Sequence, residues 1–245
     1  MKIVLQKFIA EAGVCSRRKA EDFIKDGLVM INDKVAKLGD RVDEHDEVLL
    51  DGVQIYRQEK LVYIILNKPK GYTCTSRQFV DEKNIFDLVN AKERLFVVGR
   101  LDKNSEGLVL LTNDGALTQK ITHPKYEHEK KYLVSIVSRG LEARIIQNDF
   151  KQGVDIGDGD GIVKAKNIKA VGTDKFEIIL TQGKKRQIRR MFGVLGCDVL
   201  ELARIKIGSL EMGDLKVGEW RYLSEAEVKG LMVEKKKEVV KKVKK

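Results

Sequence analysis

The chain has 245 residues, of which 42% are hydrophobic and 34% charged, and its formal net charge at pH 7 is +10. This length and apolar content exclude a mini-protein and a disordered chain, and they fit one or two domains of ordinary size. The longest apolar runs are far shorter than the roughly 18 residues of a membrane-spanning helix, and the N-terminus lacks the features of a secretory signal. We therefore expect a cytoplasmic protein with no membrane partner.

Cysteine and histidine are scarce and scattered. The three cysteines are far apart and odd in number, and the three histidines share no ligand spacing with them: Cys15, Cys74, Cys197, His45, His123 and His128. Structural zinc sites need closely spaced Cys or His ligands, and disulfide frameworks need paired cysteines. The sequence therefore predicts neither a disulfide framework nor a metal site.

The positive charge is unevenly distributed. Residues 234–245 hold seven lysines and two glutamates and so carry half of the excess, whereas residues 1–50 hold nine basic and ten acidic side chains. We interpret the lysine-rich tail as a solvated appendage, because charge runs are often only that. Any nucleic-acid surface in the first 50 residues must come from clustered charges.

The first 58 residues predict a compact α+β module. Apolar residues recur at helical spacing from Leu5 to Ala12, and Gly13 can end that helix. Ser16 is a typical N-cap for a second helix, which Gly27 can end. Asp51-Gly52 between apolar residues then indicates a β-hairpin.

Residues 56–60 are polar and form the expected linker to a larger α+β domain, 61–233, built on a large sheet. Helices are predicted over 117–121 and 186–195, the latter with an apolar stripe and Gly196 just past its end. Strands are predicted over six apolar runs, 61–67, 95–101, 107–113, 131–137, 162–171 and 176–181.

Two basic clusters point to an anionic partner. Arg17, Arg18 and Lys19 fall in the first turn of a predicted helix, where the positive end of the helix dipole disfavours cations. A backbone phosphate would reverse that penalty, although three exposed side chains that tolerate it are an equal alternative.

The second cluster, residues 184–190, has five cations in seven positions. Arg186 and Arg190 are spaced i and i+4, so on one helix they would repel each other. We infer that a negative group lies nearby, and we expect the apolar stripe of the same helix to hold the arginines at the surface. The candidate RNA-binding side chains here are Lys184, Lys185, Arg186 and Arg190.

The segment 99–107 lies between two strongly apolar predicted strands, and by composition it is a polar turn. Its spacing alone does not make Asp102 catalytic. Without reference to any protein family, these residue patterns therefore indicate a cytoplasmic α+β protein that binds RNA or DNA.

In combination, these segments resemble the RsuA-type family of bacterial ribosomal RNA pseudouridine synthases over nearly the whole chain except the tail. Residues 13–21 are similar to the S-four-like RNA-binding module that opens these enzymes. Residues 66–71, 99–115, 129–134 and 182–191 are similar, in order, to motifs of the catalytic domain. The amino-acid sequence around Asp102 and Arg186 is most similar to that of the RluF branch, which modifies large-subunit rRNA.

The resemblance implies roles for individual residues. Asp102 matches the catalytic aspartate, Tyr132 the tyrosine that contacts the target base, and Arg189 the arginine that pairs with the aspartate. A bidentate arginine partner would favour the charged form of Asp102. Arg100 and Lys68, which lie in the matched motifs, are further candidates for substrate binding.

The family also implies the architecture and the reaction. We expect an S-four-like domain over 1–58 and a catalytic domain over 61–233 on a mixed, mainly antiparallel sheet with flanking helices. The expected reaction isomerises uridine to pseudouridine in ribosomal RNA, and the expected target is 23S rRNA. The base is flipped out of its stack, and no metal or other cofactor is expected. Two alternatives stay open: a tRNA substrate, and a non-catalytic RNA-binding or ribosome-assembly factor. With no long apolar face left over, we expect a monomer.

Overall fold

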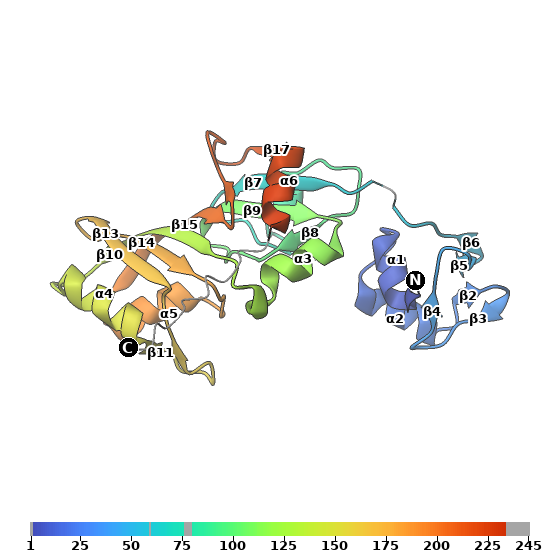
Figure 1. The fold of residues 1–245 in the computed structure, drawn as a ribbon, viewed down its shortest axis with the longest axis horizontal. Coiled ribbons are helices and arrows are strands. Elements are labelled where there is room, and N and C mark those ends of the chain that lie inside the picture. The colour runs from blue at the N-terminus through green and yellow to red at the C-terminus, as the bar shows by residue number, and fades with distance from the viewer. Residues whose placement is uncertain (1, 59, 76–79, 234–245) are drawn as a thin grey trace, which may run out of the picture.

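The computed structural model describes residues 2–58, 60–75 and 80–233, so the lysine-rich tail lies outside the described residues. Helices and short strands make up an α+β module within residues 2–58 (Figure 1, blue). Helix α1 (Leu5–Glu11) is followed by α2 (Arg17–Lys25), whose first turn is capped by the Ser16 hydroxyl, which accepts a hydrogen bond from the backbone of Lys19 at 3.2 Å. The two helices pack on short strands: β1 (Ile3–Val4), β2 (Val29–Ile31), β3 (Lys34–Val35), β4 (Arg41–Val42), β5 (Val48–Leu50) and β6 (Val53–Gln54).

Gln58 links the module to the rest of the chain through two hydrogen bonds. Its backbone N–H donates to the carbonyl of Glu11 at the end of α1. Its side-chain carbonyl accepts a hydrogen bond of 2.9 Å from Asn113. Figure 1 shows the module at one end of the molecule, with the connecting segment leading into β7.

The larger part of the chain is built on one mixed sheet of nine strands, as expected. The order along the sheet is β13-β14-β10-β15-β9-β7-β17, with β16 beside β15 and β8 beside β9. Among the described strands only β9 and β15 run parallel. The strands are β7 (Tyr63–Lys68), β8 (Phe96–Val98), β9 (Glu106–Thr112), β10 (Lys130–Val137), β13 (Asn167–Gly172), β14 (Lys175–Leu180), β15 (Asp198–Ile207), β16 (Leu210–Glu211) and β17 (Trp220–Tyr222).

Helices lie on both faces of this sheet (Figure 1). Helices α4 (Ala143–Gln152) and α5 (Gln187–Val194) pack into a core shared with β10, β13 and β14. Helices α3 (Gly115–Thr122) and α6 (Glu225–Met232) enclose a separate core with β8, β9 and β16. Strands β7 and β9 contribute alternate residues to the two cores, which explains why their sequences are almost continuously apolar.

One predicted strand differs in the structure, and several elements were not predicted. The run 162–171 is two strands, since β12 (Ile162–Val163) pairs with β11 (Val154–Asp155) as a separate hairpin before β13 begins. Strand β15 was not predicted, because charged residues such as Glu201 and Lys206 interrupt its apolar pattern. Two short 3-10 helices, η1 (Ile85–Asp87) and η2 (Pro124–Tyr126), and the helices α4 and α6 were also missed, although the capping box of Ser224 and Glu227 marks the start of α6.

The parallel contact of β9 with β15 depends on Gly107. Its φ of +100° is a conformation that side chains rarely adopt, and a Cβ atom there would lie 2.3 Å from the carbonyl oxygen of Arg204. The two backbones approach so closely that only glycine fits. Gly107 therefore sets the position of β15 against the start of β9.

We predict that Gly107→Ala destabilises the protein by more than about 3 kcal/mol, because a strained backbone and a clash with main-chain atoms act together. Gly140→Ala is the matched control, since Gly140 has a φ of +88° but no neighbour within 4 Å. It is expected to lose only about 1–2 kcal/mol through φ strain. Chemical denaturation of both variants measures the difference, and equal losses would contradict the close approach.

Candidate active site

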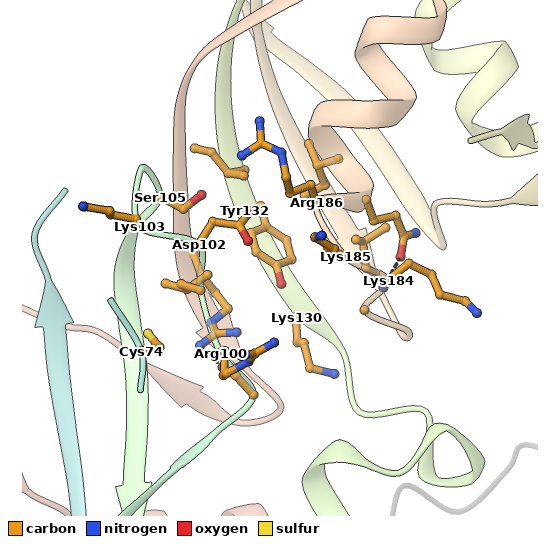
Figure 2. Close-up of a pocket in the computed structure, with 18 of the residues that line it drawn as sticks. Cys74, Arg100, Asp102, Lys103, Ser105, Lys130, Tyr132, Lys184, Lys185 and Arg186 are labelled. Carbon is orange, nitrogen blue, oxygen red and sulfur yellow. Dashed lines mark hydrogen bonds between the residues drawn. The ribbon is translucent and has the colours of Figure 1, made fainter. Parts of the chain in front are cut away.

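A cavity of about 740 Å³ opens beside the segment between β8 and β9 that carries Asp102. We call residues 99–105 the Asp102 loop. The remaining walls come from the start of β10, from β15 and from the residues that lead into α5. Figure 2 shows Asp102 beside the ring of Tyr132, with Arg100 and Lys130 toward one end of the cavity and 184–186 along the opposite side.

Strand β10 positions Tyr132. Residues at alternate positions of this strand are buried, so Lys130, Tyr132 and Val134 lie on one face of the sheet, toward the helix-covered core. Tyr132 is 8% exposed, and it lines the same cavity as Asp102. The structure thus brings together the two residues to which the family resemblance gives the central roles.

Three cationic side chains hold the backbone of the Asp102 loop. The Nζ atom of Lys68 donates hydrogen bonds to the carbonyls of Lys103 at 3.2 Å and Ser105 at 2.6 Å. Arg189 donates to the carbonyl of Asn104 at 2.9 Å, and Arg204 to that of Gly99 at 2.7 Å. The loop is therefore fixed at both ends and in the middle by groups from β7, α5 and β15.

Lys68 does not fit its predicted role in substrate binding. Its side chain is fully buried, it is not among the residues that line the cavity, and its ammonium group also donates to the carbonyl of Pro69. A buried lysine without a carboxylate partner needs several acceptors, and the carbonyls supply them. Its contacts place it in the support of the Asp102 loop, out of reach of a substrate.

The expected bidentate pairing of Arg189 with Asp102 is also wrong in this structure. Within the described residues Arg189 makes no ion pair with Asp102. Its two terminal nitrogens donate to the carbonyls of Val199 and Asn104, and its buried Nε atom has no hydrogen-bond partner there. Burial and the nearby Arg186 lower the pKa of Arg189, and the negative charge of Asp102 opposes that shift. The two charges interact across a distance, while the direct contact of Arg189 is with the loop backbone.

The basic run before α5 is divided by a left-handed residue. Arg186 has a φ of +52° and precedes the helix, so it does not stack on Arg190 as the i, i+4 spacing predicted. Arg190 turns away and binds Asp160 at 2.6 Å and the carbonyl of Gly157 at 2.7 Å. The expected negative partner thus belongs to the protein itself, and Arg190 is engaged in holding the β11–β12 hairpin. It is not free to bind RNA.

The other cations of this run remain at the cavity. Lys184, Lys185 and Arg186 are exposed and line it, and Lys184 also lies 3.3 Å from Asp160. Arg100 is exposed on the opposite wall. Among the described residues that line the cavity, Asp102 is the sole acidic one, and it faces seven cations: Arg100, Lys103, Lys130, Lys184, Lys185, Arg186 and Arg204. Such a surface attracts polyanions.

Arg204, Lys130 and Cys74 were missed by the sequence analysis. Arg204 is 1% exposed and, besides Gly99, binds the carbonyl of Leu108 at 2.8 Å, so a charged residue in a poorly patterned strand links the start of the loop to β9. Lys130 could have been found, because it is two residues before Tyr132 on an alternating strand. Cys74 has a raised pKa caused mainly by burial.

The N-terminal basic cluster lies apart from the cavity. Arg17, Arg18 and Lys19 are exposed in the first turn of α2, as predicted, and the ammonium group of Lys19 is 4.7 Å from the ring centre of Phe23. No group of three or more potential metal ligands occurs in the described part of the chain. None of its helices is long and apolar enough to cross a membrane.

The support of the Asp102 loop is testable at Lys68. We predict that Lys68→Met removes the side-chain donor of the Ser105 carbonyl, while the Lys103 carbonyl keeps the backbone N–H of Gly71 at 2.8 Å. The loss costs about 1–3 kcal/mol and speeds hydrogen exchange in the loop. Lys70→Met is the matched control, because Lys70 is exposed and its ion pair with Glu201 is long, at 3.8 Å. Hydrogen exchange in the Asp102 loop should stay unchanged in this variant. Unaltered loop exchange in Lys68→Met would contradict this role.

The sequence and the fold match known proteins. Residues 62–193 match the family model of RNA pseudouridylate synthase, and residues 5–48 match that of the S4 domain. A crystal structure of a pseudouridylate synthase superimposes with a TM-score of 0.69 at 30% identity and covers 94% of this chain and 99% of the other.

Several curated relatives are similar over most of their length. The dual-specificity RNA pseudouridine synthase RluF of Salmonella typhi is 40% identical over 91% of this chain and 76% of the relative. An RNA pseudouridine synthase of Aquifex aeolicus is 41% identical over 93% of both chains. The ribosomal large subunit pseudouridine synthase B of Bacillus subtilis is 37% identical over 93% of this chain and 94% of the relative. The chain therefore belongs to the RNA pseudouridylate synthase family and carries an N-terminal S4 domain.

Proposed function

We propose that this protein isomerises uridine to pseudouridine in ribosomal RNA, and that its target lies in the large subunit. The observation that carries the proposal is one carboxylate, Asp102, on a loop held by three cations beside the Tyr132 ring in an otherwise cationic cavity. The names of the relatives, which include a large-subunit synthase and the dual-specificity RluF enzymes, support RNA of this class.

Asp102 is the proposed catalytic residue. The N1–C1′ bond of uridine breaks, the uracil turns within the cavity, and C5 bonds to C1′, with no change of redox state. A carboxylate serves this chemistry either as a nucleophile at C1′ or as a base at C2′. The reaction requires no external electron acceptor, so we propose that the enzyme works without a metal or other cofactor.

Tyr132 and Arg189 support this carboxylate in different ways. The Tyr132 ring offers a flat face on which a flipped-out uracil can stack, a contact worth about 1–3 kcal/mol. Arg189 is a positioning residue, since its hydrogen bond to the carbonyl of Asn104 fixes the loop two residues from Asp102. Rigid placement of the carboxylate removes the need to order it during the reaction.

The exposed cations bind the RNA backbone. Lys184, Lys185 and Arg186 on one wall and Arg100 on the other are placed to hold phosphates next to the flipped nucleotide, while Arg17 to Lys19 provide a second contact through the S4 domain. We assign residues 1–58 to RNA binding and 61–233 to catalysis. A ribosomal substrate implies a cytoplasmic enzyme, and one complete cavity in one chain implies that a monomer suffices.

A tRNA substrate is the second candidate, and the description of the RluF relatives as dual-specificity RNA pseudouridine synthases is compatible with a second class of RNA. A uridine in a stem-loop presents the same flippable base in either RNA. Mapping pseudouridines in rRNA and tRNA from a deletion strain identifies both the substrate class and the nucleotide. If both RNAs keep every modification, the proposed activity is contradicted.

Asp102→Asn tests the catalytic assignment. Because an amide is neither a nucleophile nor a base here, we predict that the release of tritium from C5-tritiated rRNA falls by about 10³-fold or more. RNA affinity should persist, since no phosphate contact is removed. Asp214→Asn is the control, because Asp214 is exposed in the segment after β16 and should retain full activity.

Retained turnover in Asp102→Asn would refute the assignment. A non-catalytic assembly factor would be indicated if Asp102→Asn restored growth and ribosome assembly of a deletion strain while wild-type protein released no tritium.

The S4 contact is tested by the double variant Arg17→Gln and Arg18→Gln. Removing two cations should weaken RNA binding at low salt and reduce the slope of log affinity against log salt by about 1 for each phosphate that is no longer neutralised. Lys34→Gln is the control, because Lys34 is exposed on β3 of the same module. An unchanged salt slope in the double variant would assign the two arginines to a merely solvated surface.

A further inference from the structure

Lys130 is a buried titratable group at the cavity that the chemistry above does not use. It is 8% exposed, lies on the same face of β10 as Tyr132, and lines the cavity together with Asp102 (Figure 2). Its Nζ atom donates a hydrogen bond of 3.2 Å to the carbonyl of His128. In the described parts of the chain no carboxylate forms an ion pair with it, so its positive charge is poorly compensated.

The other basic groups of the cavity are unsuited to accept a proton. The guanidinium groups of Arg100, Arg186 and Arg204 stay protonated in proteins. Lys103 is 2.9 Å from Glu82 and Lys184 is 3.3 Å from Asp160, so both ammonium groups are engaged in ion pairs. Lys185 is exposed to water. Lys130 differs from all of these, since it is buried and lacks an anionic partner.

Its surroundings disfavour the charged form. Burial, and to a smaller extent the charge of Arg204 on β15, lower the pKa of Lys130 from 10.5 to about 8. On the strands to either side, the residues paired with Lys130 are apolar: Leu180 on β14 and Ile207 on β15. A substantial fraction of neutral amine is therefore present near pH 8. A general base works most efficiently when its pKa lies near the operating pH.

We propose that the Lys130 amine is the base that removes the C5 proton of the rearranged uracil. The inference rests on the proposed isomerisation of uridine. Once C5 has bonded to C1′, that carbon carries both the new bond and its original hydrogen. A base must then take this hydrogen before the aromatic-like ring of pseudouridine can form. Asp102 is engaged at the ribose, so a second group is needed.

The step balances without another reactant. The C5–H bond breaks, its electron pair restores the C5=C6 double bond, and the electrons of the N1=C6 bond return to N1. The neutral amine of Lys130 becomes an ammonium group, and N1 takes a proton from it, or from water, in which case the hydroxide formed takes the proton of the ammonium group. Lys130 is left neutral after one turnover, and a tritium label from C5 reaches the solvent.

Two variants distinguish a base from a simple positive charge. Lys130→Met should lower tritium release by about 100-fold or more, the usual contribution of general base catalysis. Lys130→Arg should lose as much, because guanidinium keeps the charge but cannot accept a proton. Lys131→Met is the matched control, since Lys131 lies on the opposite face of β10, 3.1 Å from Glu177, and should retain wild-type turnover.

Isotope effects and rescue report the step itself. With C5-deuterated uridine, both Lys130 variants should show a larger isotope effect than wild type, because proton removal becomes rate-limiting. Added methylamine should restore part of the turnover of Lys130→Ala, with more rescue as pH rises and the amine becomes neutral. Wild-type turnover should rise with pH through about 8 and then level off.

Folding is monitored by thermal unfolding. The pKa of Lys130 is lower in the folded than in the unfolded state, so the unfolded chain binds more protons between about 8 and 10.5, and the lysine lowers stability at neutral pH. Lys130→Met should therefore melt no lower than wild type at pH 7. A low activity with this profile is not a folding defect.

The outcomes separate the two proposals. If wild type releases tritium while Lys130→Met or Lys130→Arg retains its turnover and isotope effect, the inference about Lys130 fails and the proposed function stands. Restoration of activity by arginine alone would make Lys130 an electrostatic group and overturn its role as a base. If wild type releases no tritium from any RNA and a deletion strain keeps all its pseudouridines, the proposed function fails and the inference falls with it.

Discussion

The carbonyl groups of the Asp102 loop are the constraint on which the site depends. A tight loop between two buried strands cannot satisfy its carbonyls within a sheet, so their donors must come from other parts of the chain. Lys68, Arg189 and Arg204 supply the donors from three different elements. The same hydrogen bonds that complete the fold therefore fix the carboxylate of Asp102 beside Tyr132.

This arrangement also determines the electrostatics of the cavity. Three supporting cations and the basic walls surround the carboxylate of Asp102, the one anion among the described residues of the cavity lining, so the cavity attracts an RNA phosphate. The concentration of positive charge has a consequence at Lys130, whose burial and proximity to Arg204 oppose protonation. Stability is given up locally where the chemistry needs a neutral base, a common pattern at functional sites.

The sheet explains why the loop can be held so firmly. Strands β7 and β9 are covered on both faces, with Leu66 and Val109 in one core and Ile65 and Leu110 in the other. Their apolar runs place Lys68 and the start of β9 in the rigid interior, on either side of the loop. The close backbone contact at Gly107 then sets β15, and with it Arg204, against that start.

The sequence by itself determined the local structure and the residue types of the site. The Ser16 cap, the Asp51-Gly52 hairpin and the alternating strand around Tyr132 follow from short-range rules of hydrogen bonding and side-chain direction, and the ordered motifs identified the family. Only the tertiary structure decided what the basic residues do. From the sequence, Lys68, Arg190 and Arg204 look like exposed charges or charges that follow no pattern. Their partners are backbone carbonyls and acidic side chains far away in the chain, and no local pattern encodes such contacts.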